Sequence, residues 1–568
     1  MHRTFFHAGF LLAVACSACS NAEPRDLDGG FDSGGPPSDA SVSRDSTSDG
    51  GSISPDGGRT FAEPTCAPGQ APIPDGMQRG SFTCTAVGAS TATPTGDWPD
   101  VTGTRMPLVY VQPGASGDGS MASPVGTIAE ALTLLQMRGD GTIVLSRGTH
   151  VVAATILFDR SVTVLGVPGP MGTLVQPPAS TSAFDATAGA GAVVSLEQLT
   201  INKDTPHMGP VLRAMGDGSV HLRDVSIDHS DVGIELPDTA GVHASLDAQR
   251  LTITNAQIGV QAGTTHTVAL RSFRIENARV GVKSLGSSIT ATEGMVHNFT
   301  AAGLSIDSMS TTAPSTMQLD RIALWDGDGY GAWLGGSMLT VTATHMLVSG
   351  VRAMSGNAAA SGIGLFVTKA HLDLDTNIGS DAQQALGSII GHNAGTGIVF
   401  DGQATAVVRG AYVASNGQSG IVVQATANVT EIGYSYFTDN IGTGLVVSAG
   451  GIIAGLLCNG FVANIAGAMQ FTGAALDMQD SVVIAPQQST RYQVVVSGNE
   501  FASSARYGLY CVGVDAILMG NTFMNNAMGD AVLVDGNATG TQATDVTQTP
   551  AGTAGEPLPG SLATGSAP

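Results

Sequence analysis

The second half of the chain repeats an asparagine that is followed, four residues later, by glycine and two aliphatic residues. Three clear copies begin at Asn393, Asn416 and Asn440, and a degenerate copy begins at Asn464. The asparagines are therefore 23, 24 and 24 residues apart. A fixed period of this length is typical of repeat proteins, in which each unit buries its apolar face only by stacking on its neighbours. The period predicts an elongated solenoid.

Each repeat consists of short β-rich runs. After Gly420 the chain reads Ile-Val-Val, then Asn-Val-Thr-Glu-Ile, then Tyr-Ser-Tyr-Phe, with turn residues between these runs. No helical period of apolar residues is sustained here. Three short strands and their turns account for ~23 residues at about 3.3 Å per strand residue. We therefore expect one repeat to form one turn of a three-sided solenoid.

Weaker copies upstream can be aligned in register. Four tripeptides match: Val225-Ser-Ile, Leu251-Thr-Ile, Phe273-Arg-Ile and Ile322-Ala-Leu. Because strand side chains alternate, we expect the outer two positions to point inward and the middle one to face solvent. A set of asparagines is expected to share one corner, where side-chain amides bond between turns and tolerate left-handed backbone. This set is Asn255, Asn277, Asn393, Asn416 and Asn440.

Together these features resemble the right-handed parallel β-helix superfamily, in its pectate-lyase-like and periplasmic copper-binding-protein-like branch. The resemblance covers residues 108–538 and implies an all-β, right-handed, three-sided parallel β-helix with a short N-terminal capping helix. Ser123 and Pro124 are the expected N-cap and first helical residue, and Gly139 is the expected end. About 13 or 14 turns at ~4.8 Å each are expected.

Residues 1–19 resemble a bacterial lipoprotein signal. An apolar run from 5 to 15 is too short to span a bilayer, and Cys16 and Cys19 each follow small residues. The resemblance implies lipidation at Cys16, with Cys19 as the alternative. It also implies export and attachment to the cell envelope, at the outer membrane or cell surface, through the lipid alone.

The segments flanking the repeat have the composition of linkers. Residues 20–60 are rich in Asp, Gly, Ser and Pro and are expected to form a disordered tether, as is the tail at 539–568. Residues 61–107 form a small segment in which Cys66 and Cys84 are expected to pair, because a disulfide would staple a stretch with little core in an exported protein.

The charge of the chain limits its partners. The net charge is −23 and only 12% of residues are charged, about half the usual share. Nucleic acid is excluded as a partner, since it requires basic clusters. A monomer that contacts a polysaccharide or cell-surface glycan is expected. No set of metal ligands stands out, so the expected cofactor is none, with Ca²⁺ left open.

Enzymes of the resembled fold cleave acidic polysaccharides with carboxylates, which hold Ca²⁺, and an Arg or Lys base. One outward column is expected to contain Asp228, Thr254 and Glu276, with no two acids on consecutive turns. Asp228, His229 and Asp231 resemble the Asp-Pro-His-Asp signature of alginate epimerases, although Ser intervenes and Pro is missing. These three residues are candidate catalytic groups. A tight acidic turn explains the same residues without chemistry.

A second candidate lies in Trp325-Asp-Gly-Asp-Gly-Tyr330. Trp325 and Tyr330 could stack on a sugar ring while Asp326 and Asp328 bond its hydroxyls. Asp-Gly pairs are also ordinary turn residues.

Two functions follow. The favoured hypothesis is a non-catalytic, lipid-anchored envelope rod for surface display, adhesion or glycan contact. The alternative is a carbohydrate-active enzyme, a lyase or epimerase, that acts on acidic polysaccharide. Three or more acids and a basic residue converging in one groove would favour the enzyme.

Overall fold

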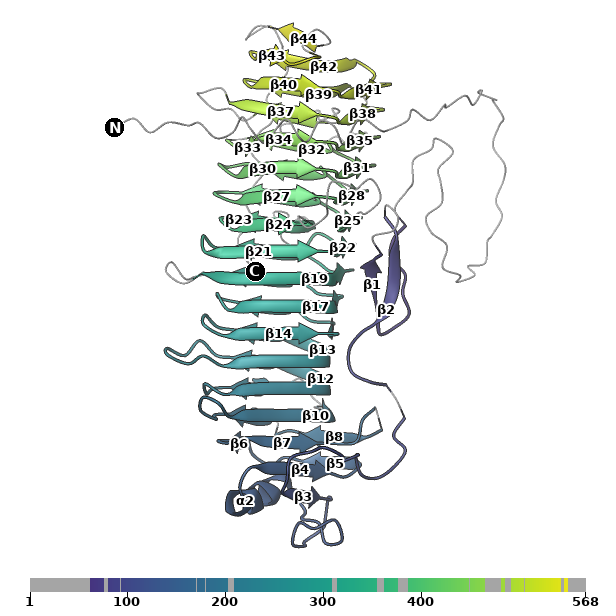
Figure 1. Ribbon diagram of the computed structural model, residues 1–568. Helices are drawn as coiled ribbons and strands as arrows, with labels where there is room; N and C mark the ends of the chain where they lie inside the picture. Colours follow the sequence, from purple (N-terminus) through teal and green to yellow (C-terminus); the bar gives the residue numbers. More distant parts are fainter. Residues whose placement is uncertain are drawn as a thin grey trace, which may run out of the picture.

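In a computed structural model the chain forms a long rod of stacked parallel strands, with its one helix among the described residues at one end (Figure 1). The rod has about 14 turns. The structure describes residues 62–549, apart from 76–79, 92, 170, 179, 203–208, 309–313, 355–361, 376–386, 449, 465–481, 486–491, 505 and 543–545. The all-β solenoid is therefore confirmed, while its right-handedness and three sides stay predictions.

The strands that position the sites come from consecutive turns in the middle of the rod. They are β12 (Ser219–Leu236), β13 (Ser245–Ala262), β15 (Arg274–Glu276), β16 (Val280–Ser284), β17 (Ser288–His297), β18 (Ala302–Asp307), β19 (Ser315–Trp325), β20 (Tyr330–Gly335), β22 (Leu347–Ser349), β23 (Ile363–Thr368), β24 (His371–Leu374) and β26 (Ile398–Asp401). Each strand pairs in parallel with its counterpart one turn away, as β16 does with β18 and β18 with β20.

The aligned tripeptides lie in register, as the sequence predicts. Val225 is opposite Leu251, and the next turn places Thr252 opposite Arg274. Apolar side chains at the inward positions form one continuous core. Towards the C-terminal end this core contains a ladder of stacked phenylalanines. The centroid separations are 4.6 Å, 5.5 Å and 5.0 Å along Phe437, Phe461, Phe501 and Phe523.

The repeated asparagines form a buried ladder. The amide of Asn393 donates to Asn416 at 2.9 Å, Asn416 to Asn440 at 2.8 Å, and Asn440 to Asn464 at 2.8 Å. The predicted hydrogen bonds between turns are therefore confirmed. Left-handed backbone belongs instead to the residue before each one, as at Ser415 with φ of 55°.

Asn255 and Asn277 belong to a different ladder. They themselves adopt left-handed backbone, with φ of 55° and 54°, and their side chains are exposed. The amide of Asn277 donates to Asn255 at 3.3 Å. The expectation of one shared corner position was wrong. The strand pairing places Asn277 level with His392, one residue before Asn393, so the two sets of asparagine side chains lie on opposite sides of the chain.

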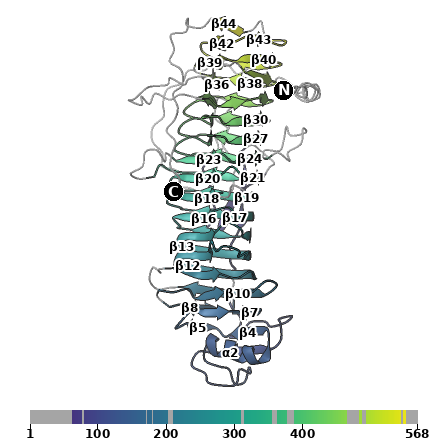
Figure 2. The ribbon, with the colours of Figure 1, turned by 90° about the vertical axis from the view of Figure 1, so that its left-hand side faces the viewer.

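The helix α2 (Ile128–Arg138) caps one end of the rod, as predicted (Figure 2). Its N-cap is Thr127 rather than Ser123, because the Thr127 hydroxyl accepts the Glu130 amide while Glu130 reaches back to the Thr127 amide. This reciprocal pair satisfies two free amides at once. Gly139 ends the helix as expected.

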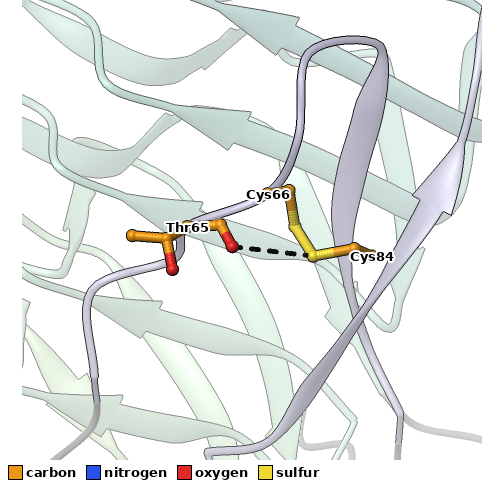
Figure 3. The surroundings of a disulfide bond; sticks show 3 residues. All are labelled: Thr65, Cys66 and Cys84. Atoms are coloured by element: carbon orange, nitrogen blue, oxygen red, sulfur yellow. Dashed lines mark hydrogen bonds between the residues drawn. A yellow bond between two sulfur atoms is a disulfide. The ribbon is translucent and has the colours of Figure 1, made fainter. Parts of the chain in front are cut away.

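A hairpin of β1 (Gln70–Pro74) and β2 (Phe82–Ala86) lies alongside the middle of the rod (Figure 1). Cys66 and Cys84 are joined by a disulfide at its base, where the sequence predicts one (Figure 3). Ile73 of the hairpin packs on Ala323, the middle residue of the tripeptide Ile322-Ala-Leu, and on its neighbours. The column formed by these middle residues is therefore buried in this stretch. The expectation that the middle column faces solvent was wrong here, because the hairpin covers it.

The two ends of the chain can be compared with the sequence predictions only where the structure describes them. The solenoid continues past residue 538, since β44 (Val546–Thr549) pairs with β42 (Gly529–Val534). Cys16, Cys19 and the predicted tether lie outside the described residues. Among the residues that are described, no helix has the length and apolar character needed to cross a membrane.

Candidate functional site

One outward column of side chains connects both of the sequence candidates. Strand pairing places Asp228, Thr254, Glu276, His297 and Trp325 on five consecutive turns. The predicted column of Asp228, Thr254 and Glu276 is therefore confirmed, and it continues through two residues that the sequence does not connect to it. Since turns are ~4.8 Å apart, its upper three side chains are close neighbours.

His297 lies between two carboxylates. Its Nδ1 is 3.9 Å from Oε1 of Glu276, one turn below, and its Nε2 is 3.5 Å from Oδ2 of Asp326. The imidazole also stacks on the indole of Trp325, with ring centroids 4.2 Å apart and planes at 23°. Stacking and two ionic neighbours together fix the orientation of the ring.

Two aspartates enter this group from the turn that follows β19. Asp326 has left-handed backbone, with φ of 54°, which directs the chain around the corner. The guanidinium of Arg352 bonds to Asp326 and, through Nε at 2.9 Å, to Asp328. The pKa of Arg352 is raised above its ordinary value, chiefly by the hydrogen bond to Asp328. This residue therefore remains a cation at any working pH.

A second arginine closes the group on the side of the hairpin. Nη1 of Arg274 is 3.8 Å from Oε2 of Glu276. Gly88 approaches Arg274 closely and donates its amide to the Ser272 carbonyl at 2.9 Å. Among the described residues, Nε of Arg274 and Nε1 of Trp325 are buried without a hydrogen-bond partner. Two unused donors thus lie at the boundary between hairpin and rod.

We call this group the His297 cluster. It consists of Arg274, Glu276, His297, Trp325, Asp326, Asp328 and Arg352. It holds three acids and two arginines around one imidazole, which meets the criterion for an enzyme in residue type. The side chains of His297, Asp326 and Arg352 are 27%, 45% and 52% exposed, so a polymer in solvent can reach them.

The predicted catalytic residues lie at the lower end of the same column and belong to the outer asparagine ladder. Oδ1 of Asp228 accepts from Thr254 Oγ1 at 2.7 Å and from Asn255 Nδ2 at 2.8 Å. Nδ1 of His229 is 2.8 Å from Oδ2 of Asp228, and Asp231 is exposed. The hydrogen bonds show that Asp228 ends a ladder, in agreement with the turn interpretation.

The predicted sugar-binding residues do not form one site. Trp325, Asp326 and Asp328 belong to the His297 cluster, but Tyr330 is 1% exposed and packs in a separate apolar cluster with Trp333 and Phe366. The intervening turn carries the chain from one face of the rod to another. The expectation that Tyr330 joins the other three in a single surface was therefore wrong.

Sequence reasoning missed His297, Arg274 and Arg352 as members of a site. The signal that could have found His297 was available, because extending the predicted column of Asp228, Thr254 and Glu276 by one more repeat reaches it. Arg352 carried no such signal, since its contact depends on the path of the turn after β22.

The His297 cluster does not fit a Ca²⁺ site. Glu276, Asp326 and Asp328 each lie beside a cation, whereas Ca²⁺ requires six to eight oxygen ligands. In the part of the chain that the structure describes, no group of three or more His, Cys, Asp or Glu side chains is arranged to hold a metal ion.

No family model matches the sequence, and no curated protein matches it. Among solved structures, the chain is similar to the A-module of mannuronan C-5 epimerase AlgE6 from Azotobacter vinelandii, with 13% identity over 77% of this chain and 98% of that one, at a TM-score of 0.27. It is also similar to the periplasmic alginate epimerase AlgG, with 9% identity over 75% of this chain and 89% of that one, at a TM-score of 0.27. A third similar structure is the catalytic unit of a GH87 α-1,3-glucanase from Streptomyces thermodiastaticus, with 12% identity over 84% of this chain and 71% of that one, at a TM-score of 0.26.

At these identities and scores the likeness is one of fold. The favoured hypothesis from the sequence, a non-catalytic rod for display or adhesion, is nevertheless corrected. The reason is the His297 cluster, which brings together the acids and bases that the alternative requires.

Proposed function

We propose that the chain is a carbohydrate-active enzyme, a lyase or an epimerase, that acts on an acidic polysaccharide at the His297 cluster. The observation that carries this proposal is an imidazole held between two carboxylates, stacked on an indole and flanked by two guanidinium groups. Each of these groups has a part in removing a proton from the carbon next to a sugar carboxylate.

The cluster can supply the charge that this chemistry needs. The proton beside a carboxylate becomes acidic only when the negative charge is neutralised, and Arg352 is the most exposed cation of the cluster. A guanidinium binds a carboxylate through two parallel hydrogen bonds. Arg352 is therefore assigned the binding of the substrate carboxylate.

His297 is assigned the proton transfer. One ring nitrogen accepts the proton while a carboxylate at the other nitrogen holds the ring in place and stabilises its charged form. In a lyase the resulting carbanion expels the glycosyl group attached to the neighbouring carbon and leaves a double bond. In an epimerase a proton returns to the opposite face of the sugar.

The first test is activity on alginate and on polygalacturonate, each with and without Ca²⁺. Absorbance reports the unsaturated sugar of a lyase, and proton NMR reports the inverted sugar of an epimerase. Because general acid–base groups contribute roughly 10²–10⁴-fold, His297→Ala should lose activity by about that factor. The matched control is His371→Ala, since His371 also pairs with an aspartate, at 3.1 Å, but lies outside the cluster. Wild-type protein that changes neither polymer, or equal losses in both variants, would overturn the proposal.

We also propose that the protein works as an exported monomer, attached to the envelope by a lipid on Cys16. Support comes from the signal-like residues 1–19 and the polar composition of residues 20–60. Labelling with radioactive palmitate should be lost in Cys16→Ala and kept in Cys19→Ala. The reverse pattern would assign the lipid to Cys19. If the wild type itself takes up no label, the proposal of a lipid anchor is wrong.

A further inference from the structure

A cleft of about 390 Å³ opens on a different face of the rod from the His297 cluster. It lies over β18, β20, β23 and β26, which stack turn upon turn, as Figure 2 shows for β18, β20 and β23. The cleft shares no residue with the His297 cluster. Its volume lies within the ordinary range of small-ligand sites.

The absence of one side chain creates the cleft. Register places Asp307, Gly335, Thr368 and Asp401 at one position on four consecutive turns. A Cβ at Gly335 would lie 3.3 Å from Oδ1 of Asp307 and 3.3 Å from Nε1 of Trp333. The carboxylate and the indole N–H therefore face the same open space above the glycine.

The wall of the cleft is aromatic and rigid. Trp333 and Phe366 stack with ring centroids 4.5 Å apart and planes at 14°, and Tyr330 packs edge-on against both. Trp333 is only 6% exposed, so its orientation is fixed by the side chains around it. The edge of the Trp333 indole that carries the Nε1–H donor faces the cleft. Rigid aromatic walls with a few fixed polar groups are typical of ligand sites.

One polar group at the cleft lacks a partner. Among the described residues, the hydroxyl of Ser308 is buried without a hydrogen bond, and the residue is 5% exposed. A buried hydroxyl left unpaired costs roughly 1–3 kcal/mol, so such groups normally have a partner. Ser308 lines the cleft, so the polar group that the chain leaves unpaired lies in the cleft wall.

The charge of the cleft selects against acidic ligands. Asp307 and Asp401 line it from the two ends of the row, and Lys369 is the one cation among its lining residues. Asp401 is 8% exposed and accepts from Nε2 of Gln424 at 3.2 Å, which holds its carboxylate in place. Two carboxylates against one ammonium leave a negative site, and no guanidinium is among its lining residues to take up a sugar carboxylate as Arg352 can.

We infer that this cleft binds a saccharide without carboxylates, separately from the acidic polymer proposed for the His297 cluster. Carboxylates and hydroxyls bond to sugar hydroxyls, and the net negative charge favours a sugar that bears an amino group over a neutral one. The inference goes beyond the proposed function and does not depend on it.

The test is calorimetric titration of the full-length protein with matched oligomers of β-1,4-glucan, chitosan and mannuronate. The glucan and chitosan oligomers should bind at this cleft, chitosan more tightly, whereas any binding of mannuronate belongs to the His297 cluster and should be unchanged in Gly335→Leu. Gly335→Leu fills the space above the strand and should weaken binding by tenfold or more, as roughly expected when several hydrogen bonds are lost. Asp307→Asn keeps the shape and should weaken chitosan binding by about threefold to tenfold.

Matched variants separate this site from the His297 cluster and from a folding defect. His297→Ala should bind the glucan and chitosan oligomers as the wild type does. Gly455→Ala serves as the strand-glycine control, because a Cβ there makes only ordinary contacts at 3.8 Å. If Gly335→Leu does not fold, the Asp307→Asn titration decides. No binding of glucan or chitosan oligomers by the wild type, mannuronate binding that Gly335→Leu weakens, or unchanged chitosan binding in Asp307→Asn would each overturn the inference.

Discussion

At the scale of single residues, the molecule places its ionisable groups in pairs between turns. Asp185 with Arg213, Asp224 with Arg250, and Glu431 with Arg409 are examples, and each joins side chains on neighbouring turns. Such pairs are ordinary cross-strand stabilisation. The His297 cluster differs, because one imidazole is shared between two acids.

The buried carboxylate of Asp375 leads to a pH-dependent prediction. Burial raises its pKa to about 6, although the amides of His345 and Ser388 donate to it at 3.0 Å and 2.7 Å. The unfolded value is about 3.9, so the folded chain holds a proton that the unfolded chain releases. The stability from this group is full below about pH 4 and is lost as the pH rises through about 6.

Asp375→Asn removes this titration. The stability advantage of the wild type over the variant should therefore shrink between about pH 4 and about pH 7, by on the order of 2–3 kcal/mol. Thermal unfolding of both proteins at the two pH values measures it. An advantage that grows with pH would show that the carboxylate is charged in the folded chain throughout.

At the scale of elements, the ladders hold the turns in register. Asn416 donates to Asn440 at 2.8 Å and to the Ile390 carbonyl at 3.2 Å, with its side chain fully buried. Asn277 in the outer ladder is exposed, although it also bonds to asparagines on the turns on either side, at 3.3 Å and 2.6 Å. The same residue type thus contributes very differently to stability at the two positions.

Asn416→Ala should destabilise the rod by roughly 2–4 kcal/mol, because it leaves buried partners without hydrogen bonds. Asn277→Ala is the exposed control and should cost only about 1 kcal/mol, because alanine tolerates the left-handed backbone of this position less well than asparagine. Chemical denaturation measures both. Equal effects would mean that burial of the ladder is unimportant.

The hairpin of β1 and β2 yields a second prediction at this scale. Its disulfide spans 18 residues, and a loop of about this length contributes roughly 3 kcal/mol. In Cys66→Ser/Cys84→Ser the hairpin should therefore leave the rod, exposing Met295 and Leu347, which it covers. Hydrogen exchange should rise in residues 69–89 while the solenoid strands keep their protection. Unchanged exchange in the hairpin would show that its packing alone holds it.

Much of this element structure could be predicted from the sequence. The period of the asparagines and the alternation in tripeptides such as Leu251-Thr-Ile depend only on local pattern, and both were confirmed. Burial of the middle column at Ala323 could not be predicted, because it depends on a hairpin more than 200 residues away in sequence. Likewise, nothing near Tyr330 shows that the turn before it changes face.

At the scale of the whole molecule, function follows from the stacking of turns. Residues of different repeats become neighbours only when the register is known, as with Glu276 and His297. Neither residue belongs to a local motif, which explains why motif searching favoured Asp228, His229 and Asp231 instead. The fold was therefore far more predictable than the site.

The net charge of −23 gives a prediction for the whole molecule. A polyanionic substrate is repelled at long range, and salt screens this repulsion over about 10 Å at 0.1 M. The association rate with alginate should therefore rise when ionic strength increases from about 0.01 M to about 0.15 M. Stopped-flow fluorescence measures this rate. A rate that falls with salt would indicate that a local basic surface controls the encounter.

The most direct measurement of the central claim is exchange of the sugar proton with solvent. Alginate and polygalacturonate are incubated with the protein in D₂O, and NMR follows the loss of the proton beside the carboxylate. Lyase and epimerase both remove this proton, so the account predicts exchange or elimination with wild type and with His371→Ala. For His297→Ala, the account predicts that the rate of this proton loss falls by roughly 10²–10⁴-fold. Wild-type protein that leaves this proton untouched in both polymers would contradict the account.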